Sequence, residues 1–117
     1  MIIIKGNITM NIKTSQENQY TKVSIEADRL DVTNMQTMKD EIQDILNNYH
    51  KIILDLSAVS FLDSSGLSIL ISILKQLNKV EDAQLKLCGL NPQPYELMQI
   101  TQLYNVFDIV TDCDSIV

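Results

Sequence analysis

The chain has 117 residues, of which 45% are hydrophobic, so it can form one domain with a substantial core and is too short for two ordinary domains. Its 9 basic and 15 acidic residues give a net charge of −6, and no cluster of lysines or arginines offsets that charge locally. Such a chain repels nucleic-acid phosphates and anionic lipids, so we expect neither nucleic-acid binding nor membrane insertion.

The apolar segments predict neither a targeting signal nor a membrane span. Before Lys5 the chain holds only the short apolar run of residues 2–4, less than a signal peptide needs. The longest apolar run, residues 67–74, is shorter than the ~18 residues of a membrane span. We therefore expect a cytoplasmic protein. In a reducing compartment, Cys88 and Cys113, which lie far apart and lack C-x-x-C spacing, are expected to be free thiols.

Alternation of apolar and polar residues predicts a hairpin in the first part of the chain. The alternation covers residues 8–13 and 20–27, as in half-buried strands, and the polar residues 15–18 predict the loop between them. The expected buried face of the second strand consists of Val23, Ile25 and Ala27.

A helix is predicted next, because apolar residues recur at steps of three and four. These residues are Met35, Met38, Ile42, Ile45, Leu46 and Tyr49. Thr33 lies before this stripe and Gln36 lies in its first turn, at the spacing of a capping box. In a capping box the side chain of each residue bonds to the backbone of the other.

The rest of the chain alternates buried strands with helices. Residues 51–56 and 84–90 are short apolar runs typical of strands covered on both faces, and residues 64–78 between them predict a helix. Pro94 suits the first turn of another helix, and residues 106–110 predict a last strand. The expected inner faces are Leu67, Leu70, Ile71, Leu74 and Leu77 in the first helix, and Leu97, Ile100, Leu103 and Tyr104 in the second. This order indicates an α/β fold with a mixed sheet.

Residues that can carry chemistry are concentrated between strand 51–56 and helix 64–78. An Asp or Ser directly before such a helix is a common N-cap, which alone would account for Asp63, Ser64 and Ser65. Gly66 would allow another chain to approach closely. The N-terminal end of a helix also favours negative charge, so a phosphate on Ser64 would fit there. Spacing alone leaves both interpretations open.

The stretch from residue 52 to 77, IILDLSAVSFLDSSGLSILISILKQL, resembles the signature of the STAS family, and within it that of the bacterial anti-sigma factor antagonists. In that signature a strand ending in D-L-S/T is followed by D-S-S/T-G-L at the start of a helix. The similarity extends over roughly residues 8–112. It implies the STAS fold, an α/β fold with a mixed four- to five-stranded sheet and helices packed on it. We expect a single STAS domain over residues 1–117, with residues 1–7 as an N-terminal extension and 113–117 as a shortened C-terminal tail.

The resemblance also implies a mechanism. Antagonists of this family bind an anti-sigma factor that is also a serine kinase, which releases a sigma factor for transcription. The kinase phosphorylates the serine after the aspartate of D-S-x-G, and a PP2C-type serine phosphatase reverses this. The resemblance makes Ser64 the phosphoacceptor and adds Asp31, Asp63, Ser65 and Gly66 as partner-binding residues, with Asp31 expected on the surface. It implies no enzyme activity, no cofactor and no metal.

The chain departs from the family pattern in three places. Asp28, followed by Arg29, replaces a usual glycine. A second glycine is missing in the tail, where Tyr104-Asn105 stands in the family's T-G-L-x-x-V-F pattern. Only residues 113–117 follow the last strand, where most members have a further helix. These differences concern the loop before the first helix and the C-terminal end.

The sequence disfavours two other functions and leaves a third open. A serine hydrolase is disfavoured because the chain lacks a G-x-S-x-G motif and its single histidine, His50, lies at a helix end. A phosphoacceptor-aspartate receiver would use Asp55, but no acidic pair near an earlier strand end could complete its magnesium site. A STAS scaffold subunit of a larger signalling or membrane-transport assembly stays open, since Ser64 could serve as an N-cap alone.

Overall fold

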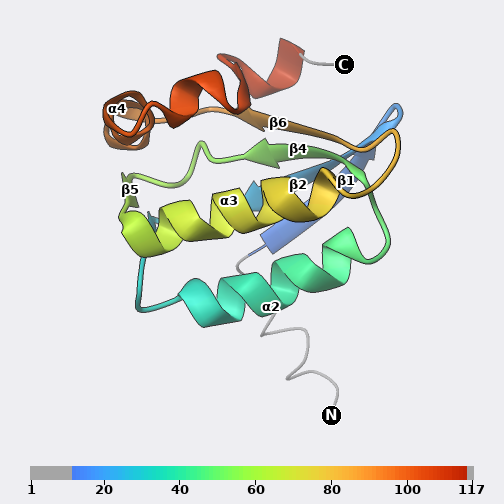
Figure 1. The fold of residues 1–117 in the computed structure, drawn as a ribbon, viewed down its shortest axis with the longest axis horizontal. Coiled ribbons are helices and arrows are strands. Elements are labelled where there is room, and N and C mark those ends of the chain that lie inside the picture. The colour runs from blue at the N-terminus through green and yellow to red at the C-terminus, as the bar shows by residue number, and fades with distance from the viewer. Residues whose placement is uncertain (1–11, 116–117) are drawn as a thin grey trace.

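A five-stranded mixed sheet runs through the computed structural model, which describes residues 12–115 (Figure 1). The strand order is β1-β2-β4-β6-β7. Strand β1 pairs antiparallel with β2, and the other neighbours pair in parallel. The strands are β1 (Ile12–Glu17), β2 (Tyr20–Ile25), β4 (Lys51–Asp55), β6 (Gln84–Cys88) and β7 (Asp108–Val110). The predicted mixed α/β sheet, with residues 51–56 in a central strand, is confirmed.

Helices α2 (Met35–Leu46) and α3 (Ser64–Leu77) pack against one face of this sheet and against each other (Figure 1). Helix α4 (Pro92–Ile100) adds the fully buried Met98 to the same core. A small second sheet of β3 (Arg29–Leu30) and β5 (Phe61–Leu62) lies where the chain enters α2 and α3. The short 3-10 helices η2 (Leu103–Asn105) and η3 (Cys113–Ser115) complete the chain. No helix within residues 12–115 is long and apolar enough to cross a bilayer.

The central strand β4 is covered on both faces, as its continuous apolar sequence predicts. Because side chains alternate along a strand, Ile52 and Leu54 enter the core beneath α2 and α3. We call this side the helix-covered face. Ile53 points the other way, into a smaller cluster with Tyr20 and Cys88. We call that side the second face.

The hairpin loop is shorter than the sequence indicates. Residues 15–17 continue β1, and Asn18 and Gln19 form the turn to Tyr20. Asn18 takes a positive φ of 59°, which asparagine tolerates better than most residues. Residues 15–17 are polar because their side chains lie at an exposed edge of the sheet, not because the strand has ended. Residues 8–11 of the predicted strand, and the predicted extension 1–7, lie outside the described residues.

The start and end of α2 also differ from the prediction. Thr33 donates its backbone N–H to Asp31 Oδ1, and Gln36 Nε2 donates to Asp40 Oδ1 at 3.1 Å, so the two residues form no capping box. The N-cap is Asn34, which makes no side-chain capping bond. Tyr49 lies beyond the end of α2 and is 43% exposed. The nearby Asp31 carboxylate has replaced the expected partner of Thr33.

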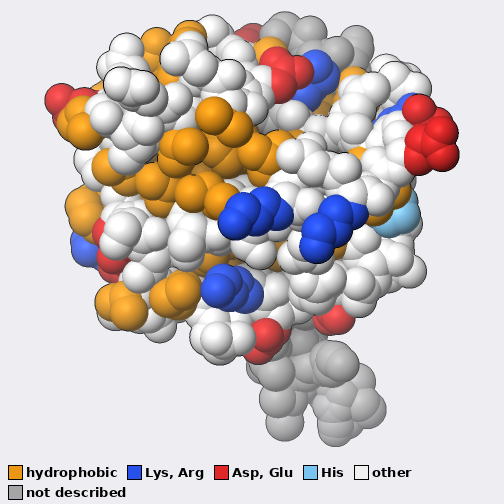
Figure 2. Space-filling model, in the orientation of Figure 1, with side chains coloured by type: hydrophobic (Ala, Val, Ile, Leu, Met, Phe, Trp, Pro, Cys, Tyr) orange, Lys and Arg blue, Asp and Glu red, His pale blue; other side chains and the backbone are white. Residues whose placement is uncertain are grey.

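The buried faces of the later helices are shifted as well. In α3, Ile69 and Ile73 are fully buried beside Leu67, Leu70 and Leu77, because this helix packs against both the sheet and α2. Ile71 and Leu74 are only half-buried, and Figure 2 shows apolar side chains reaching the surface over α3.

In α4 the inner residue is Met98, whereas Ile100 is 71% exposed. The helix ends at Ile100, and Gln102 turns the backbone to a φ of 64°. The apolar spacing from Leu97 to Tyr104 therefore spans a break in the helix, which periodicity cannot detect.

Candidate functional site at the start of helix α3

The connector of residues 57–63 carries the chain from β4 to α3. Within it, β5 pairs in parallel with β3, and the register places Leu62 opposite Leu30. Asp31 and Asp63 directly follow these paired residues, so the two acidic positions leave the small sheet side by side. Ser64 is the first residue of α3 and is exposed. The structure thus brings three predicted site residues to one end of the molecule.

Asp63 is the N-cap of α3. Its backbone is extended, and its Oδ1 accepts a hydrogen bond from the Gly66 N–H at 2.9 Å. The Asp63 carbonyl accepts from the Leu67 N–H, so the first turn is fully formed. The Ser64 hydroxyl makes no hydrogen bond to the described residues. Of the three N-cap candidates, the structure therefore selects Asp63 and leaves Ser64 without a capping function.

Gly66 and Ser65 face the protein. A Cβ at Gly66 would collide with the Leu30 carbonyl oxygen and would lie 2.7 Å from Leu62 Cδ1. The close approach at Gly66 is thus made by β3 and β5 of the same chain rather than by the other chain that the sequence led us to expect, and these strands press against the first turn of α3. Ser65 is half-buried, and its carbonyl accepts a hydrogen bond from Ser68 Oγ at 2.7 Å. These two residues hold the turn that presents Ser64.

Asp31 is buried, which corrects the expectation of a surface aspartate. Its Oδ1 accepts from the Thr33 N–H at 3.0 Å and from the Thr33 hydroxyl, and its Oδ2 accepts from Arg29 Nε at 2.9 Å. The bond from the Thr33 hydroxyl, together with that from Arg29, lowers the pKa of Asp31 below its ordinary value of 3.8. The carboxylate is ionised and engaged within the turn between β3 and α2.

Arg29 is held beside this turn by two contacts. Its guanidinium lies 4.6 Å from the centre of the Phe61 ring, and it pairs with Asp31. The Arg29 side chain is 56% exposed, so a cation remains at the surface near the two aspartates. Sequence comparison marked Arg29 only as part of a departure from the family pattern.

Two amide side chains that the sequence did not single out hold the connector. Gln93 accepts from the Leu62 N–H at 2.8 Å and donates to the Leu62 carbonyl at 2.9 Å. Asn91 Nδ2 donates to the carbonyls of Ser57 and Val59 at 3.0 and 2.8 Å. Both amides come from the start of α4. Their distant partners leave no signal in the sequence, because polar residues around prolines normally indicate only a turn.

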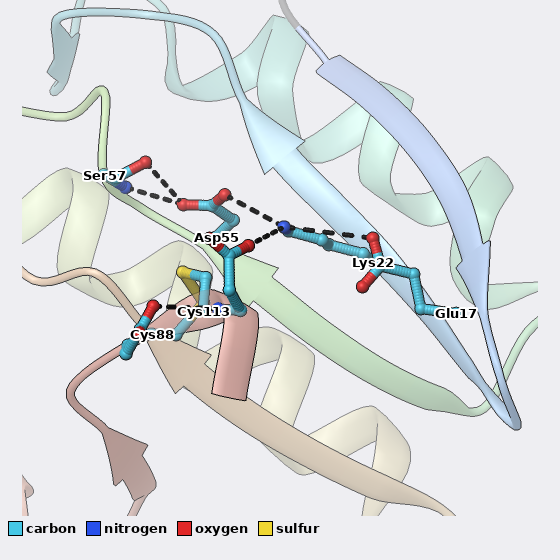
Figure 3. Close-up of a disulfide and its surroundings, with 8 residues drawn as sticks. Glu17, Lys22, Asp55, Ser57, Cys88 and Cys113 are labelled. Atoms are coloured by element: carbon cyan, nitrogen blue, oxygen red, sulfur yellow. Dashed lines mark hydrogen bonds and ion pairs between the residues drawn. A yellow bond between two sulfur atoms is a disulfide. The ribbon is translucent and has the colours of Figure 1, made fainter. Parts of the chain in front are cut away.

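On the second face, Cys88 and Cys113 form a disulfide with a Cα–Cα distance of 5.1 Å, which contradicts the expectation of free thiols (Figure 3). The cysteines lie 25 residues apart, but β7 pairs with β6 and returns the chain to Cys88. Asp55 lies close enough that one carboxylate oxygen and both sulfurs are within 4.8 Å of one another. Because the sulfurs are bonded to each other, neither is a free thiolate for a metal ion.

Lys22 sits among acidic residues beside this disulfide (Figure 3). Its Nζ lies 3.9 Å from Glu17, 3.8 Å from Asp55 and 3.7 Å from Asp114. The Asp55 carboxylate also accepts hydrogen bonds from the N–H and hydroxyl of Ser57. Both carboxylate oxygens of Asp55, at the end of β4, thus have partners within the fold: Ser57 at Oδ1 and Lys22 at Oδ2.

Comparison with known proteins places this architecture in a family. A model of the STAS domain matches residues 11–116, nearly the whole chain. The chain belongs to the STAS domain family. The match includes both the connector and the first turn of α3.

Individual relatives agree with this assignment. BtrV of Bordetella bronchiseptica, whose provisional name is anti-sigma factor antagonist, is 30% identical over 65 residues, which cover 56% of this chain and 55% of BtrV. The match thus spans about half of that relative. An anti-sigma-factor antagonist (STAS) domain protein of Planctomyces limnophilus has a similar structure, with a TM-score of 0.78 and 23% identity over 88% of this chain and 91% of that one.

SpoIIAA of Bacillus shares the fold in two chemical forms. Its unphosphorylated form has a TM-score of 0.70 and 18% identity, covering 90% of this chain and 92% of SpoIIAA. Its phosphorylated form has a TM-score of 0.65 and 18% identity, covering 90% and 96%. At these identities the structures demonstrate a common fold.

The geometry of this STAS domain suits the addition of a charged group at Ser64. The hydroxyl is exposed at the N-terminal end of a helix, where the partial positive charge of the backbone stabilises anions. Asp63 already satisfies the Gly66 N–H, so a modified Ser64 would disturb no capping bond. The site can therefore change its charge while the turn keeps its hydrogen bonds.

Proposed function

We propose that this STAS domain is an anti-sigma factor antagonist, a regulatory binding protein of the cytoplasm rather than an enzyme. It binds an anti-sigma factor that is also a serine kinase, and phosphorylation of Ser64 ends that binding. A PP2C-type phosphatase restores the binding form. The names of the relatives support the class of protein. The observation that carries the switch is that Asp63 caps α3 while the exposed Ser64 hydroxyl is unengaged.

The magnitude of the effect follows from where the phosphate lies. A phosphoserine carries about −1.5 to −2 charges at neutral pH. At an exposed helix N-terminus this charge gains only about 0.3–1 kcal/mol, so the fold is nearly indifferent to it. In an interface, an ion that is buried and poorly paired costs several kcal/mol. Since ~1.4 kcal/mol is a tenfold change, we expect partner affinity to fall about 100-fold or more.

The partner-binding residues divide into two kinds in this proposal. Ser64 and Asp63 contact the partner, together with Val32, which is 66% exposed in the turn after β3. Asp31 and Gly66 are buried, and they contribute by holding this surface in place. Ser65 belongs with them because its carbonyl bonds within α3.

The first prediction concerns Ser64 directly. We expect Ser64→Ala to fold normally, retain kinase binding and accept no phosphate, because its hydroxyl supports no hydrogen bond of the fold. Ser64→Asp should bind more weakly, since it adds a negative charge. Each protein is incubated with ATP and candidate serine kinases of the source cell, and phosphorylation is measured by intact-mass analysis and peptide mapping. Calorimetry then measures the affinity of each protein for the kinase.

Ser60→Ala and Ser65→Ala are the matched controls. Ser60 is exposed in the connector and Ser65 is the neighbouring half-buried serine. Both variants should still be phosphorylated once. A phosphate mapped to either serine, or equal binding of the phosphorylated and unmodified proteins, contradicts the proposal.

A further inference from the structure

The C-terminal segment, residues 111–115, lies over the second face of the sheet. Cys113 of this segment and Val110 of β7 pack against the cluster of Tyr20, Ile53 and Cys88. Ile53 and Cys88 are both 0% exposed, although α2, α3 and α4, the long helices of residues 12–115, contribute to the core on the other side. The short C-terminal segment and its disulfide therefore help to keep an apolar part of the sheet away from water.

The two sulfurs of the disulfide differ in access. Cys88 ends a strand within the sheet and is fully buried. Cys113 lies on η3 and is half-buried, next to Asp114, whose side chain is 89% exposed. A thiolate attacks a disulfide in line with the sulfur–sulfur bond. Cys88 is closed to such an attack by its burial, whereas Cys113 is only half-buried, on an exposed segment.

We propose that the Cys88–Cys113 disulfide is a reversible thiol–disulfide exchange site, attacked at Cys113, whose redox state decides whether the C-terminal segment covers the second face. The substrates of the site are small thiols and dithiol reductants. This inference rests on the second face and does not depend on the proposed function of Ser64.

The exchange proceeds in two balanced steps. A thiolate of the reductant bonds to Cys113 Sγ, the Cys88–Cys113 bond breaks, and Cys88 leaves as a thiolate that takes up a proton. The second thiolate of a dithiol then attacks the reductant sulfur of the mixed disulfide and releases Cys113, which is also protonated. The protein gains two electrons and two protons, and the dithiol becomes a disulfide.

The ion pair between this segment and Lys22 is weaker than the covalent bond. Asp114 pairs with Lys22 at 3.7 Å, but its carboxylate is largely in water, where such pairs contribute little. Lys22 would keep Glu17 and Asp55 as partners if the segment moved away. We therefore expect reduction to release the segment and to open the second face at Ile53 and Cys88.

The first experiment identifies the attacked sulfur. The oxidised protein is treated with glutathione, quenched with N-ethylmaleimide and mapped by peptide mass analysis. EDTA is included, because free thiolates bind metal ions. We expect glutathione on Cys113 and maleimide on Cys88. Glutathione mainly on Cys88, or equal shares on both, overturns the proposal, and so does a disulfide that resists excess dithiothreitol in the folded protein.

The second experiment measures whether the bond keeps the face covered. Cys113→Ser removes the bond and leaves Cys88 as a reporter, whose alkylation rate is compared with that of the same variant unfolded in urea. An uncovered Cys88 should react within about 100-fold of the unfolded rate, as expected for a segment of low local stability. Stronger protection overturns the proposal.

Because Cys113→Ser could fail to fold, a further variant and hydrogen exchange of the wild-type protein provide independent tests. Asp114→Asn removes the ion pair to Lys22 but keeps the disulfide, so its second face should stay protected from hydrogen exchange. Reduced wild-type protein, with both cysteines present, should exchange the amides of residues 108–113 faster than oxidised protein. Equal exchange of the two forms, with cooperative unfolding retained, counts against the proposal.

Discussion

The two faces of the central sheet are buried by different means. On the helix-covered face, aliphatic side chains such as Leu54 and Leu87 pack beneath α2 and α3. On the second face, Ile53 and Cys88 are equally buried, but they pack with Tyr20, with Val110 and with Cys113 of the disulfide on the short C-terminal segment. Equal burial therefore does not mean equal support. The first face depends on packing alone, and the second depends on the chemical state of two sulfurs.

Neighbouring residues of β4 provide the largest test of this difference. Leu54 and Ile53 are 1% and 0% exposed, and they point to opposite faces. Leu54→Ala should lower the free energy of unfolding by about 2–5 kcal/mol, toward the upper end because the helices cannot collapse onto the cavity. Ile53→Ala should fall toward the lower end, because a thin cover relaxes more easily. Urea titration of both variants checks this order, and a larger cost at Ile53 would reverse the comparison.

Reduction of the disulfide provides the next test. The bond closes a loop of 25 residues, and constraint of the unfolded chain by such a loop contributes about 3 kcal/mol. Urea titration with and without dithiothreitol measures this loss. The cost of Ile53→Ala should change under reducing conditions while that of Leu54→Ala stays constant, since only Ile53 lies beneath the segment. Identical shifts for both variants would mean that the faces are not independent.

Glu41 provides the smallest test, because it is a destabilising buried carboxylate on helix α2. Its carboxylate is buried on α2 with no hydrogen-bond partner among the described residues, and burial raises its pKa above the ordinary value of 4.5. The ionised form is thus disfavoured in the fold. Stability is lost as pH rises above the unfolded pKa toward the raised folded one, and below the unfolded pKa the penalty is absent.

Glu41→Gln should therefore stabilise the protein by about 1 kcal/mol at neutral pH, since it removes the buried charge. The gain should shrink as the pH falls from the raised folded pKa toward 4.5 and should vanish below 4.5, where both proteins are neutral at this position. Thermal unfolding at several pH values measures it, with Asp44→Asn on the exposed side of α2 as control. A gain that does not vary with pH would assign the effect to packing.

Local patterns in the sequence predicted the strand, connector and helix around Ser64, and the structure confirms these elements. Such patterns work there because the strand, the N-cap and the helix are each determined by residues close in sequence. The choice of Asp63 over Ser64 as the cap, however, depends on where Gly66 is pressed against Leu30. The phosphoacceptor assignment itself came from family resemblance.

Features that depend on residues distant in sequence could not be predicted from local patterns. The disulfide exists because β7 returns beside β6, and the buried Asp31 follows β3, which pairs with the distant β5. The apolar stripe from Leu97 to Tyr104 misled because spacing does not record the left-handed turn at Gln102. In each case the missing information was a tertiary contact or a single backbone angle.

The paired hydrogen bonds of Gln93 have a consequence for self-association. In the parallel pair of β3 and β5, Leu62 turns its N–H and carbonyl away from β3, toward an edge that another strand could join. The Gln93 amide occupies both groups and acts as a stand-in for one peptide unit of that missing strand. A second molecule therefore finds no free backbone N–H or carbonyl at Leu62 on which to extend the small sheet.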